Sequence, residues 1–407
     1  MKRVFTLVVL ALFASSLLAQ SIDFNQGSIT QKKFLEKISY QNIDGKIVVP
    51  VTINGKMYNF VIDTGATLTI SDKLFKELNL QIVGQSNVMD ASGRMKEARI
   101  ILLPELHLQG ITFIDTPGFV IQEESSDFIN LLECFGIDGI IGSNMLRNLV
   151  IQFDEQSKHV LISNNLFQIF KDKVGKNVGK SQKMLLYPSQ SCPYITIGLK
   201  KEGKKGIGDL VLFDTGAPDF YEMSMSTYNW LNDRVDMTII ADTEGSYGWG
   251  FHGNFEQQQH LLLSIPEFHV NEKIFNDVIV TATHSMSLIG TRLLQYGRIT
   301  LDYKKGRFYF YPFDNVNTDE LSEKPPAFNP VWQNDKLVVG IIWDKSLESQ
   351  INLGDEIVSI NGLSFENMEV CDYMKLDFCK ETISDKYTLE LRDIETGEVK
   401  KVEIKRM

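Results

Sequence analysis

Two stretches of the sequence end in the same four residues. Residues 60–66 read FVIDTGA, and residues 210–217 read LVLFDTGA. In both, an apolar run of the kind that forms a buried strand is followed by Asp-Thr-Gly-Ala, so a carboxylate stands at a predicted strand end and a glycine permits a tight turn after it. One copy also fits an ordinary strand end. Two copies indicate an internal repeat.

The repeat extends well beyond the motif. Residues 139–142 read GIIG and residues 287–290 read SLIG. The last glycine of the first run lies 79 residues after Asp63 (142 − 63), and that of the second run lies 76 residues after Asp214 (290 − 214). Strand-like runs separated by turn signals make each copy mostly β. In the first copy these runs are predicted at residues 47–53, 57–62, 99–103, 111–113 and 119–122.

The duplication predicts that Asp63 and Asp214 lie side by side. An approximate two-fold axis between the copies would place equivalent residues face to face. Two carboxylates about 3 Å apart repel by roughly 5 kcal/mol at an effective dielectric constant near 20, so the pair is expected to hold one shared proton. One carboxylate can then take a proton from water while the other donates to a substrate carbonyl. We predict no metal and no organic cofactor.

The other residues of the two motifs have predicted supporting roles. Each threonine hydroxyl can both donate and accept a hydrogen bond across the interface between the copies. Each glycine lets the backbone approach the opposite copy closely. The supporting residues are Thr64, Gly65, Ala66, Thr215, Gly216 and Ala217.

With these motifs, residues 40–313 resemble the two-lobed aspartic proteases of the pepsin and retropepsin kind. The resemblance implies a duplicated, mostly β fold, catalytic roles for Asp63 and Asp214, endopeptidase activity on polypeptides, and a β-hairpin flap over the bound peptide. Alanine after Asp-Thr-Gly matches the retropepsin pattern. Pepsin-like members have a serine or threonine there, whose hydroxyl helps to keep the carboxylate ionised. We therefore expect a milder pH optimum than that of acid digestive enzymes.

Two segments are candidates for the flap. The first is a predicted hairpin turn formed by Asp90, Ala91, Ser92 and Gly93. The second is the glycine-rich segment 245–250, which contains Tyr247, Gly248 and Trp249. Glycines suit a mobile cover over a site, and they suit an ordinary surface hairpin equally well.

A separate module is predicted after the repeat. Residues 314–324 are polar and acidic, precede two prolines, and are typical of a linker. Residues 353–362 read LGDEIVSING, which resembles the signature of PDZ domains. The resemblance implies a small α+β fold that holds an extended peptide or a C-terminus by strand addition. Its carboxylate-binding loop is not recognisable, so a purely structural role stays open.

The N-terminus is typical of a secretory signal peptide. Lys2 and Arg3 precede an uncharged run, residues 4–18, and cleavage is expected after Ala19. The run is shorter than the ~20 apolar residues of a membrane span. We therefore expect an exported protein, periplasmic or secreted, without a stable span. The predicted units are a signal peptide (1–19), protease lobe 1 (20–180), protease lobe 2 (181–313), a linker (314–324) and a PDZ-like domain (325–407).

The net charge and the cysteine content limit which partners and which disulfides are expected. The net charge of −11 disfavours nucleic acid, whose phosphates need clustered Lys and Arg. Four cysteines allow three pairings. Cys371 with Cys379 is the local pair that we favour, and four buried thiols are the alternative. The internal duplication removes the need to dimerise, so we expect a monomer.

The leading interpretation is an exported aspartic endopeptidase whose tail binds substrates or partners. The alternative is a non-catalytic peptide-binding protein on the same scaffold, because a fold and a motif do not guarantee turnover.

Overall fold

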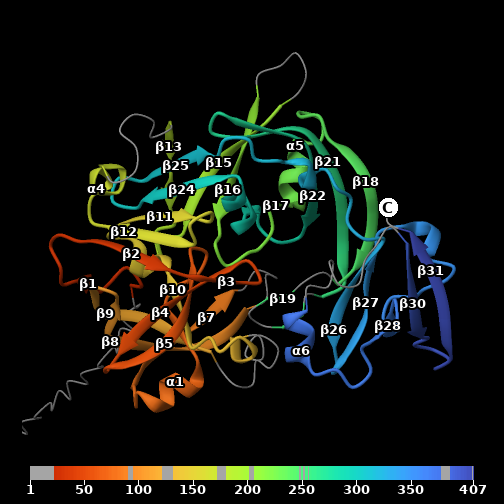
Figure 1. Cartoon of the computed structure of the whole chain (residues 1–407), viewed down its shortest axis with the longest axis horizontal. Coiled ribbons are helices and arrows are strands. Elements are labelled where there is room, and N and C mark those ends of the chain that lie inside the picture. The colour runs from red at the N-terminus through yellow and green to blue at the C-terminus, as the bar shows by residue number, and fades with distance from the viewer. Residues whose placement is uncertain are drawn as a thin grey trace, which may run out of the picture.

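The structure is a computed structural model of the chain. It is mostly β, as the strand-like runs predict (Figure 1). We call residues 23–171 the first half, residues 180–313 the second half and residues 325–407 the tail. The predicted signal peptide lies outside the described residues. The described residues are 23–89, 95–121, 132–171, 180–200, 206–246, 249–250, 253–254, 256–376, 386–405 and 407. None of the helices in these ranges has both the length and the apolar composition that a membrane crossing requires.

The first half is built on a nine-stranded sheet. Its strands follow the order β1-β9-β6-β10-β5-β4-β8-β7, with β3 beside β4. The elements of this half are β1 (Ser28–Ile29), β2 (Leu35–Ser39), β3 (Gln41–Ile43), β4 (Lys46–Ile53), β5 (Lys56–Asp63), β6 (Thr69–Ile70), α1 (Asp72–Glu77), β7 (Ile82–Met89), β8 (Met95–Leu108), β9 (Ile111–Val120), β10 (Gly139–Gly142), α3 (Ser143–Leu146), β11 (Val150–Asp154), β12 (His159–Ser163) and α4 (Leu166–Lys171). β5 runs parallel to β10, and this pairing aligns Asp63 with Gly142.

The second half repeats this pattern of pairings. Its elements are β13 (Ser181–Lys183), β14 (Leu185–Leu186), β15 (Pro193–Leu199), β16 (Ile207–Phe213), β17 (Tyr221–Ser224), α5 (Met225–Leu231), β18 (Thr238–Gly245), β19 (Trp249–Gly250), β20 (Gly253–Asn254), β21 (Gln258–Val270), β22 (Lys273–Thr283), β23 (Leu288–Ile289), η1 (Thr291–Gln295), β24 (Gly297–Asp302) and β25 (Arg307–Pro312). β16 runs parallel to β23, as β5 does to β10. β17 then pairs antiparallel with β23, as β6 does with β10.

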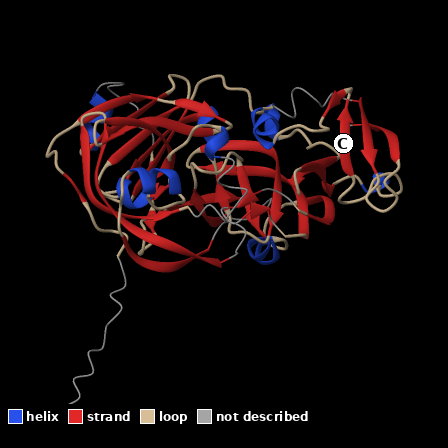
Figure 2. Cartoon of the chain, turned by 90° about the horizontal axis from the view of Figure 1, so that it is seen from below, coloured by secondary structure: helices blue, strands red, loops and turns tan. Residues whose placement is uncertain are grey.

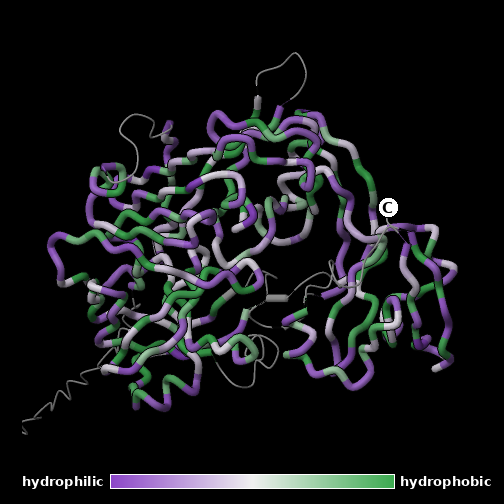
Figure 3. Tube along the Cα trace, in the orientation of Figure 1, coloured by the Kyte–Doolittle hydropathy of each residue, from purple (hydrophilic) through white to green (hydrophobic). Residues whose placement is uncertain are grey.

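A six-stranded sheet joins the two halves. Its order is β13-β25-β24-β11-β12-β2, and β11 of the first half pairs antiparallel with β24 of the second. One hydrophobic core runs through both halves. Within it, the rings of Phe153 and Phe213 lie 6.4 Å apart between centroids. Because Phe213 precedes Asp214, this shared core positions the second motif against the first half. Hydrophobic and hydrophilic residues are interspersed along the chain (Figure 3), and strands such as β10 and β11 are buried over their whole length.

The tail has a core of its own. Its elements are β26 (Phe328–Gln333), β27 (Lys336–Ile342), η3 (Lys345–Leu347), β28 (Glu356–Ile360), β29 (Leu363–Ser364), α6 (Val370–Lys375), β30 (Lys386–Arg392) and β31 (Val399–Lys405). Buried residues such as Phe328, Ile360 and Leu389 form a cluster separate from the main core. The tail lies at one end of the molecule, beside β18 of the second half (Figures 1 and 2).

Residues 314–324, predicted as a linker, lie against the second half. They contain η2 (Asp319–Leu321), and Leu321 is buried in the main core. The connection to the tail is therefore packed over part of its length.

Two predicted strands, 111–113 and 119–122, form one strand instead, β9. Pro117 and Gly118 are typical of a break, but both pair with β8. The Pro117 carbonyl accepts a hydrogen bond from Asn144 Nδ2 (2.8 Å). A Cβ at Gly118 would lie 2.6 Å from the Leu68 carbonyl oxygen, so glycine permits close approach of the segment that leads into β6.

The favoured cysteine pairing is wrong. Cys371 forms a disulfide with Cys134, with Cα atoms 4.9 Å apart, inside the range that a disulfide needs. Cys379 lies outside the described residues, and Cys192 is a free, buried thiol. The sequence distance between Cys134 and Cys371 is 237 residues, so only the docking of the tail on the first half brings them together.

Candidate active site

Asp63 and Asp214 meet between the two halves. Asp63 ends β5, and Asp214 directly follows β16. Although 151 residues separate them (214 − 63), each carboxyl group lies directly against the motif of the opposite half, Asp63 beside Gly216 and Asp214 beside Gly65. Both side chains are partly buried, so neither is sealed from solvent. We call this pair the dyad.

The two threonines hold the dyad by crossed hydrogen bonds. The Thr64 backbone N–H donates to Thr215 Oγ1, and the Thr215 N–H donates to Thr64 Oγ1, both at 3.0 Å. Each hydroxyl donates onward across the interface, Thr64 to the Phe213 carbonyl (2.5 Å) and Thr215 to the Ile62 carbonyl (2.7 Å). Both threonines are fully buried, so these four bonds satisfy groups that water cannot reach. They fix the separation of the two loops.

The glycines and the first alanine orient the carboxylates. Asp63 Oδ1 accepts from the backbone N–H groups of Gly65 (2.8 Å) and Ala66 (3.1 Å). Asp214 Oδ1 accepts from the Gly216 N–H (2.8 Å). A Cβ added at either glycine would come within 2.5 Å of the aspartate of the opposite half. Glycine is therefore required at both positions because each backbone crosses directly over a carboxyl group.

Burial raises the pKa of both carboxyl groups above the ordinary range for aspartate. The neighbouring charge of Asp214 raises the pKa of Asp63 further. Lys46 opposes these effects and lowers both values, and its Nζ lies 3.5 Å from the Gly216 carbonyl. Burial and mutual repulsion make double ionisation unfavourable, so the pair holds one proton well above the pH at which a free aspartate loses it.

Sequence reasoning missed the hydroxyls that support the two loops from behind. Ser143 Oγ donates to the Thr64 carbonyl (2.6 Å) and lies 2.9 Å from the Tyr303 hydroxyl of the second half. The equivalent residue, Thr291, donates its N–H (2.8 Å) and its hydroxyl (3.2 Å) to the Ala217 carbonyl. A signal was present, because a hydroxyl residue follows the last glycine of both repeated runs.

Cys192 is a further residue at the first loop. Its thiol donates to the Gly65 carbonyl (3.2 Å) and accepts from Gln190 Nε2 (3.1 Å). Burial raises the pKa of Cys192 to about 12, so it stays a neutral donor. No pattern in the sequence connects it with the dyad.

The flap candidates are placed only in part. Asp90, Ala91, Ser92 and Gly93 lie outside the described residues, as do Tyr247 and Gly248. β7 and β8 form the hairpin that leads to the first segment. Trp249 belongs to β19, which pairs with β20. The strand before it, β18, ends at Gly245 against Ile341 of the tail.

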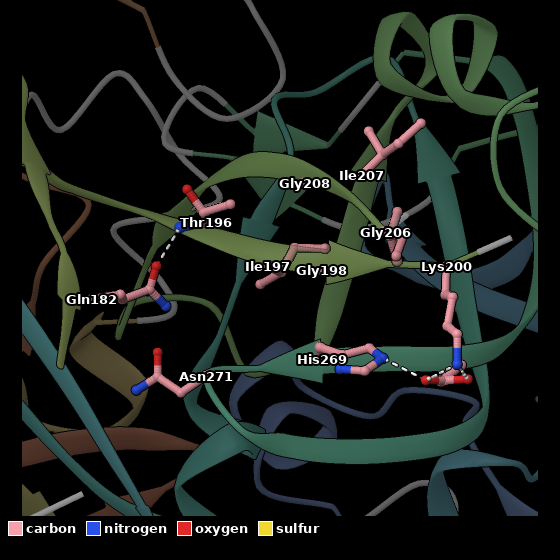
Figure 4. Close-up of a pocket in the computed structure, with 12 residues that line it drawn as sticks. Gln182, Thr196, Ile197, Gly198, Lys200, Gly206, Ile207, Gly208, His269 and Asn271 are labelled. Atoms are coloured by element: carbon pink, nitrogen blue, oxygen red, sulfur yellow. Dashed lines mark hydrogen bonds and ion pairs between the residues drawn. The ribbon is translucent and has the colours of Figure 1, made fainter. Parts of the chain in front are cut away.

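A pocket of about 490 Å³ lies apart from the dyad, on β15, β16 and β21 of the second half (Figure 4). None of its lining residues belongs to the two Asp-Thr-Gly-Ala loops. Its charged groups bind one another, since Glu267 accepts from Lys200 Nζ (2.9 Å) and contacts His269 Nε2 (2.8 Å). Gln182 Oε1 accepts from the Thr196 N–H (2.9 Å). These groups are occupied, which favours the dyad as the functional site.

Comparison with known proteins gives a match over part of the chain. Residues 49–145 match the family model described as aspartyl protease. The matched segment contains Asp63 and Gly142, and it ends before the second motif and the tail. No curated protein matches the sequence. The likeness of the first half supports an aspartyl protease family and suggests a peptidase.

Proposed function

We propose that the chain is an aspartic endopeptidase in which Asp63 and Asp214 activate a water molecule for peptide-bond hydrolysis. The observation that carries the proposal is the close approach of the two carboxyl groups across the interface, held by the crossed bonds of Thr64 and Thr215. The recurring strand pairings support a duplicated, two-lobed fold with lobes at 20–180 and 181–313. The aspartyl protease match of residues 49–145 supports the same assignment.

The geometry supplies an acid and a base from identical side chains. With one proton on the pair, the ionised carboxylate accepts a proton from a water molecule lying against both groups. The protonated carboxyl donates to the carbonyl oxygen of the peptide bond under attack. Backbone N–H bonds to Asp63 Oδ1 and Asp214 Oδ1 leave the other carboxylate oxygens for this chemistry. The protons end on the leaving amine and the new acid.

The proposed substrate is an extended, largely apolar peptide segment, and buried apolar clusters support the strands on which it would lie. Leu212 and Leu288 form one cluster with Cys192, and Ala217 of the second motif packs against it. In the first half, Val61 of β5 belongs to a similar cluster. Both clusters are built on the strands that carry or flank the aspartates.

The tail is proposed as a PDZ-like domain at 325–407. Asn361 and Gly362 adopt positive φ at the turn that ends the signature segment. Asp355 of that segment is fully buried and accepts backbone N–H bonds from Asn352 (2.9 Å) and Ile394 (3.0 Å). It therefore stabilises the fold and is closed to ligands. A peptide or a C-terminus is the proposed ligand.

Export to the periplasm or the medium is proposed as well. Residues 4–18 form the uncharged run of a signal peptide. The Cys134–Cys371 disulfide supports this location, because disulfides persist in oxidising compartments.

The proposal is tested by Asp63→Asn and Asp214→Asn, each assayed against a library of unstructured peptides between pH 3 and pH 8. We expect each variant to lose cleavage by roughly a thousandfold or more, since each removes the acid–base pair. A wild-type chain that binds such peptides and never cleaves them would favour the non-catalytic alternative.

Folding of the variants is checked by thermal melting at pH 7. Because burial raises the pKa of each aspartate, the ionised dyad destabilises the fold as the pH rises through the raised values. Asparagine removes that cost. We therefore expect melting temperatures equal to or above that of the wild type, with pepstatin raising only the wild-type value substantially.

A further inference from the structure

The tail joins the second half at one backbone junction. Gly245, the last residue of β18, pairs antiparallel with Ile341 of β27. The Ser246 N–H donates to the Gly340 carbonyl at 2.9 Å. A Cβ at Gly245 would lie 2.5 Å from the Gly340 oxygen, so the two backbones touch without intervening side chains. β18 thereby becomes the strand through which one 14-stranded sheet continues into the tail.

An apolar cluster seals this junction. Ala241 and Leu262 of the second half pack with Ile341 and Trp343 of the tail, and all four are buried. The cluster belongs neither to the main core nor to the core of the tail. The Trp343 indole N–H donates to Asn329 Oδ1 of β26 (2.6 Å), which fixes the orientation of the ring within the tail.

The tail joins the first half at a different place, through the Cys134–Cys371 disulfide. Cys134 is held rigidly, because its neighbours Leu132 and Ile137 are buried in the cluster that also contains Val61. Val61 lies in β5, two residues before Asp63. The covalent link therefore reaches the part of the first half that carries the dyad.

The other end of the disulfide is equally well anchored. Cys371 lies in the first turn of α6, whose Tyr373 ring stacks on Trp332 of β26 at 5.6 Å between centroids. Val370 and Leu376 pack against the core of the tail. Because α6 packs on the core of the tail, the helix and the tail move together. Figure 1 shows α6 on the side of the tail that faces the first half.

We propose that the tail is a brace that ties the two halves together, through the Cys134–Cys371 disulfide on one side and the β18–β27 junction on the other. Relative movement of domains is the default when an interface is small. Here each attachment keeps the two surfaces of the other attachment close together. This raises their effective concentration and makes the other contact more stable. The β18–β21 hairpin of the second half is consequently held in place by a bond made to the first half.

The brace is tested by hydrogen–deuterium exchange of the full chain in four forms: wild type, C371S, I341A and the double variant. Ile341 is chosen because it packs in the junction cluster and not in the core of the tail. We expect exchange in residues 239–246 and 338–343 to be slow in wild type and modestly faster in each single variant. In the double variant, exchange in these residues should be at least tenfold faster than in either single variant.

Two controls separate loss of the brace from loss of folding. C134S breaks the same bond from the other side, so it must reproduce C371S. Peptides from β30 and β31 report the core of the tail and should keep wild-type protection in all forms. The proposal would be overturned if C371S left the hydrogen–deuterium exchange rates of residues 239–246 and 338–343 unchanged, both in the wild-type chain and in I341A. The measurement does not depend on peptide cleavage, so it stands or fails separately from the proposed activity.

Reduction of the wild-type chain gives the same test without a mutation. A water-soluble phosphine attacks the disulfide and breaks the S–S bond, and one water molecule then supplies the oxygen of the phosphine oxide and the protons of the two thiols. Cys192 is already a thiol and is unchanged. We expect reduced wild type to match C371S, and unchanged junction exchange after complete reduction would contradict the proposal.

Discussion

The two Asp-Thr-Gly-Ala loops have the same sequence and differ in what supports them. The crossed threonine bonds are symmetric, with both N–H to hydroxyl distances at 3.0 Å. Behind the first loop, the Ser143 hydroxyl links the Thr64 carbonyl to Tyr303 of the second half. Behind the second, Thr291 supports one carbonyl that its own N–H already satisfies. Repeated residues therefore set the position of the dyad, and unrepeated residues make its two sides unequal.

The largest effect is expected at the symmetric bonds. Thr64→Val and Thr215→Val each remove a hydroxyl that donates once and accepts once, and leave a buried N–H and a buried carbonyl unpaired. Each unpaired group costs about 1 to 3 kcal/mol, so each variant should lose roughly 2 to 6 kcal/mol of unfolding free energy. Misplacement of the dyad should lower kcat/KM by about a hundredfold. Urea unfolding and peptide cleavage measure the two effects.

Equal losses in the two valine variants are what a symmetric pair requires. Thr64→Ser and Thr215→Ser keep the hydroxyl and serve as matched controls, with near wild-type stability expected. If one valine variant were as stable as its serine control while the other was not, the two threonines would not contribute equally to stability. The symmetry of the crossed bonds would then not extend to their energies.

An intermediate effect is expected behind the loops, where they differ. Ser143→Ala leaves the Thr64 carbonyl and the buried Tyr303 hydroxyl without this partner, a loss of about 1 to 3 kcal/mol. Thr291→Val keeps the N–H bond to the Ala217 carbonyl, so it should lose less than about 1 kcal/mol. Thermal or urea unfolding of both variants measures the difference. Similar losses would show that the second loop depends on its hydroxyl as much as the first does.

The dyad was predictable because the repeat places it. Similar spacing between Asp-Thr-Gly-Ala and the later glycine, 79 and 76 residues, indicates two copies of one unit, and the approximate symmetry then brings Asp63 and Asp214 together. Ser143 and Thr291 could have been found by the same comparison, since each follows the repeated glycine. Cys192 could not, because its counterpart in the strand pairing of the first half is Lys46, a different type of residue, although both donate to a glycine carbonyl of the opposite loop.

Long-range contacts that depend on the docking of the tail, or on strand pairing, could not be predicted from the sequence. The preference for Cys371 with Cys379 followed chain proximity, whereas the bond to Cys134 depends on where the tail lies. The single strand β9 was likewise missed, because Pro117 and Gly118 indicate a turn locally and only the pairing with β8 overrides that preference. Local patterns specify elements, and the contacts between units need the assembled fold.

The smallest effect is expected from Ala66→Ser and Ala217→Ser. In the wild type, burial raises both dyad pKa values, and no hydroxyl at these positions donates to the carboxylates, so a cleavage optimum well above pH 2 is expected. A serine hydroxyl would stabilise the ionised form, lower the pKa of its aspartate and move the pH profile of kcat/KM toward acid, on the order of half a pH unit. Ala66→Gly is the matched control, because it adds no donor. A shift toward alkaline pH in either serine variant, or a wild-type optimum near pH 2, would contradict this account of the dyad.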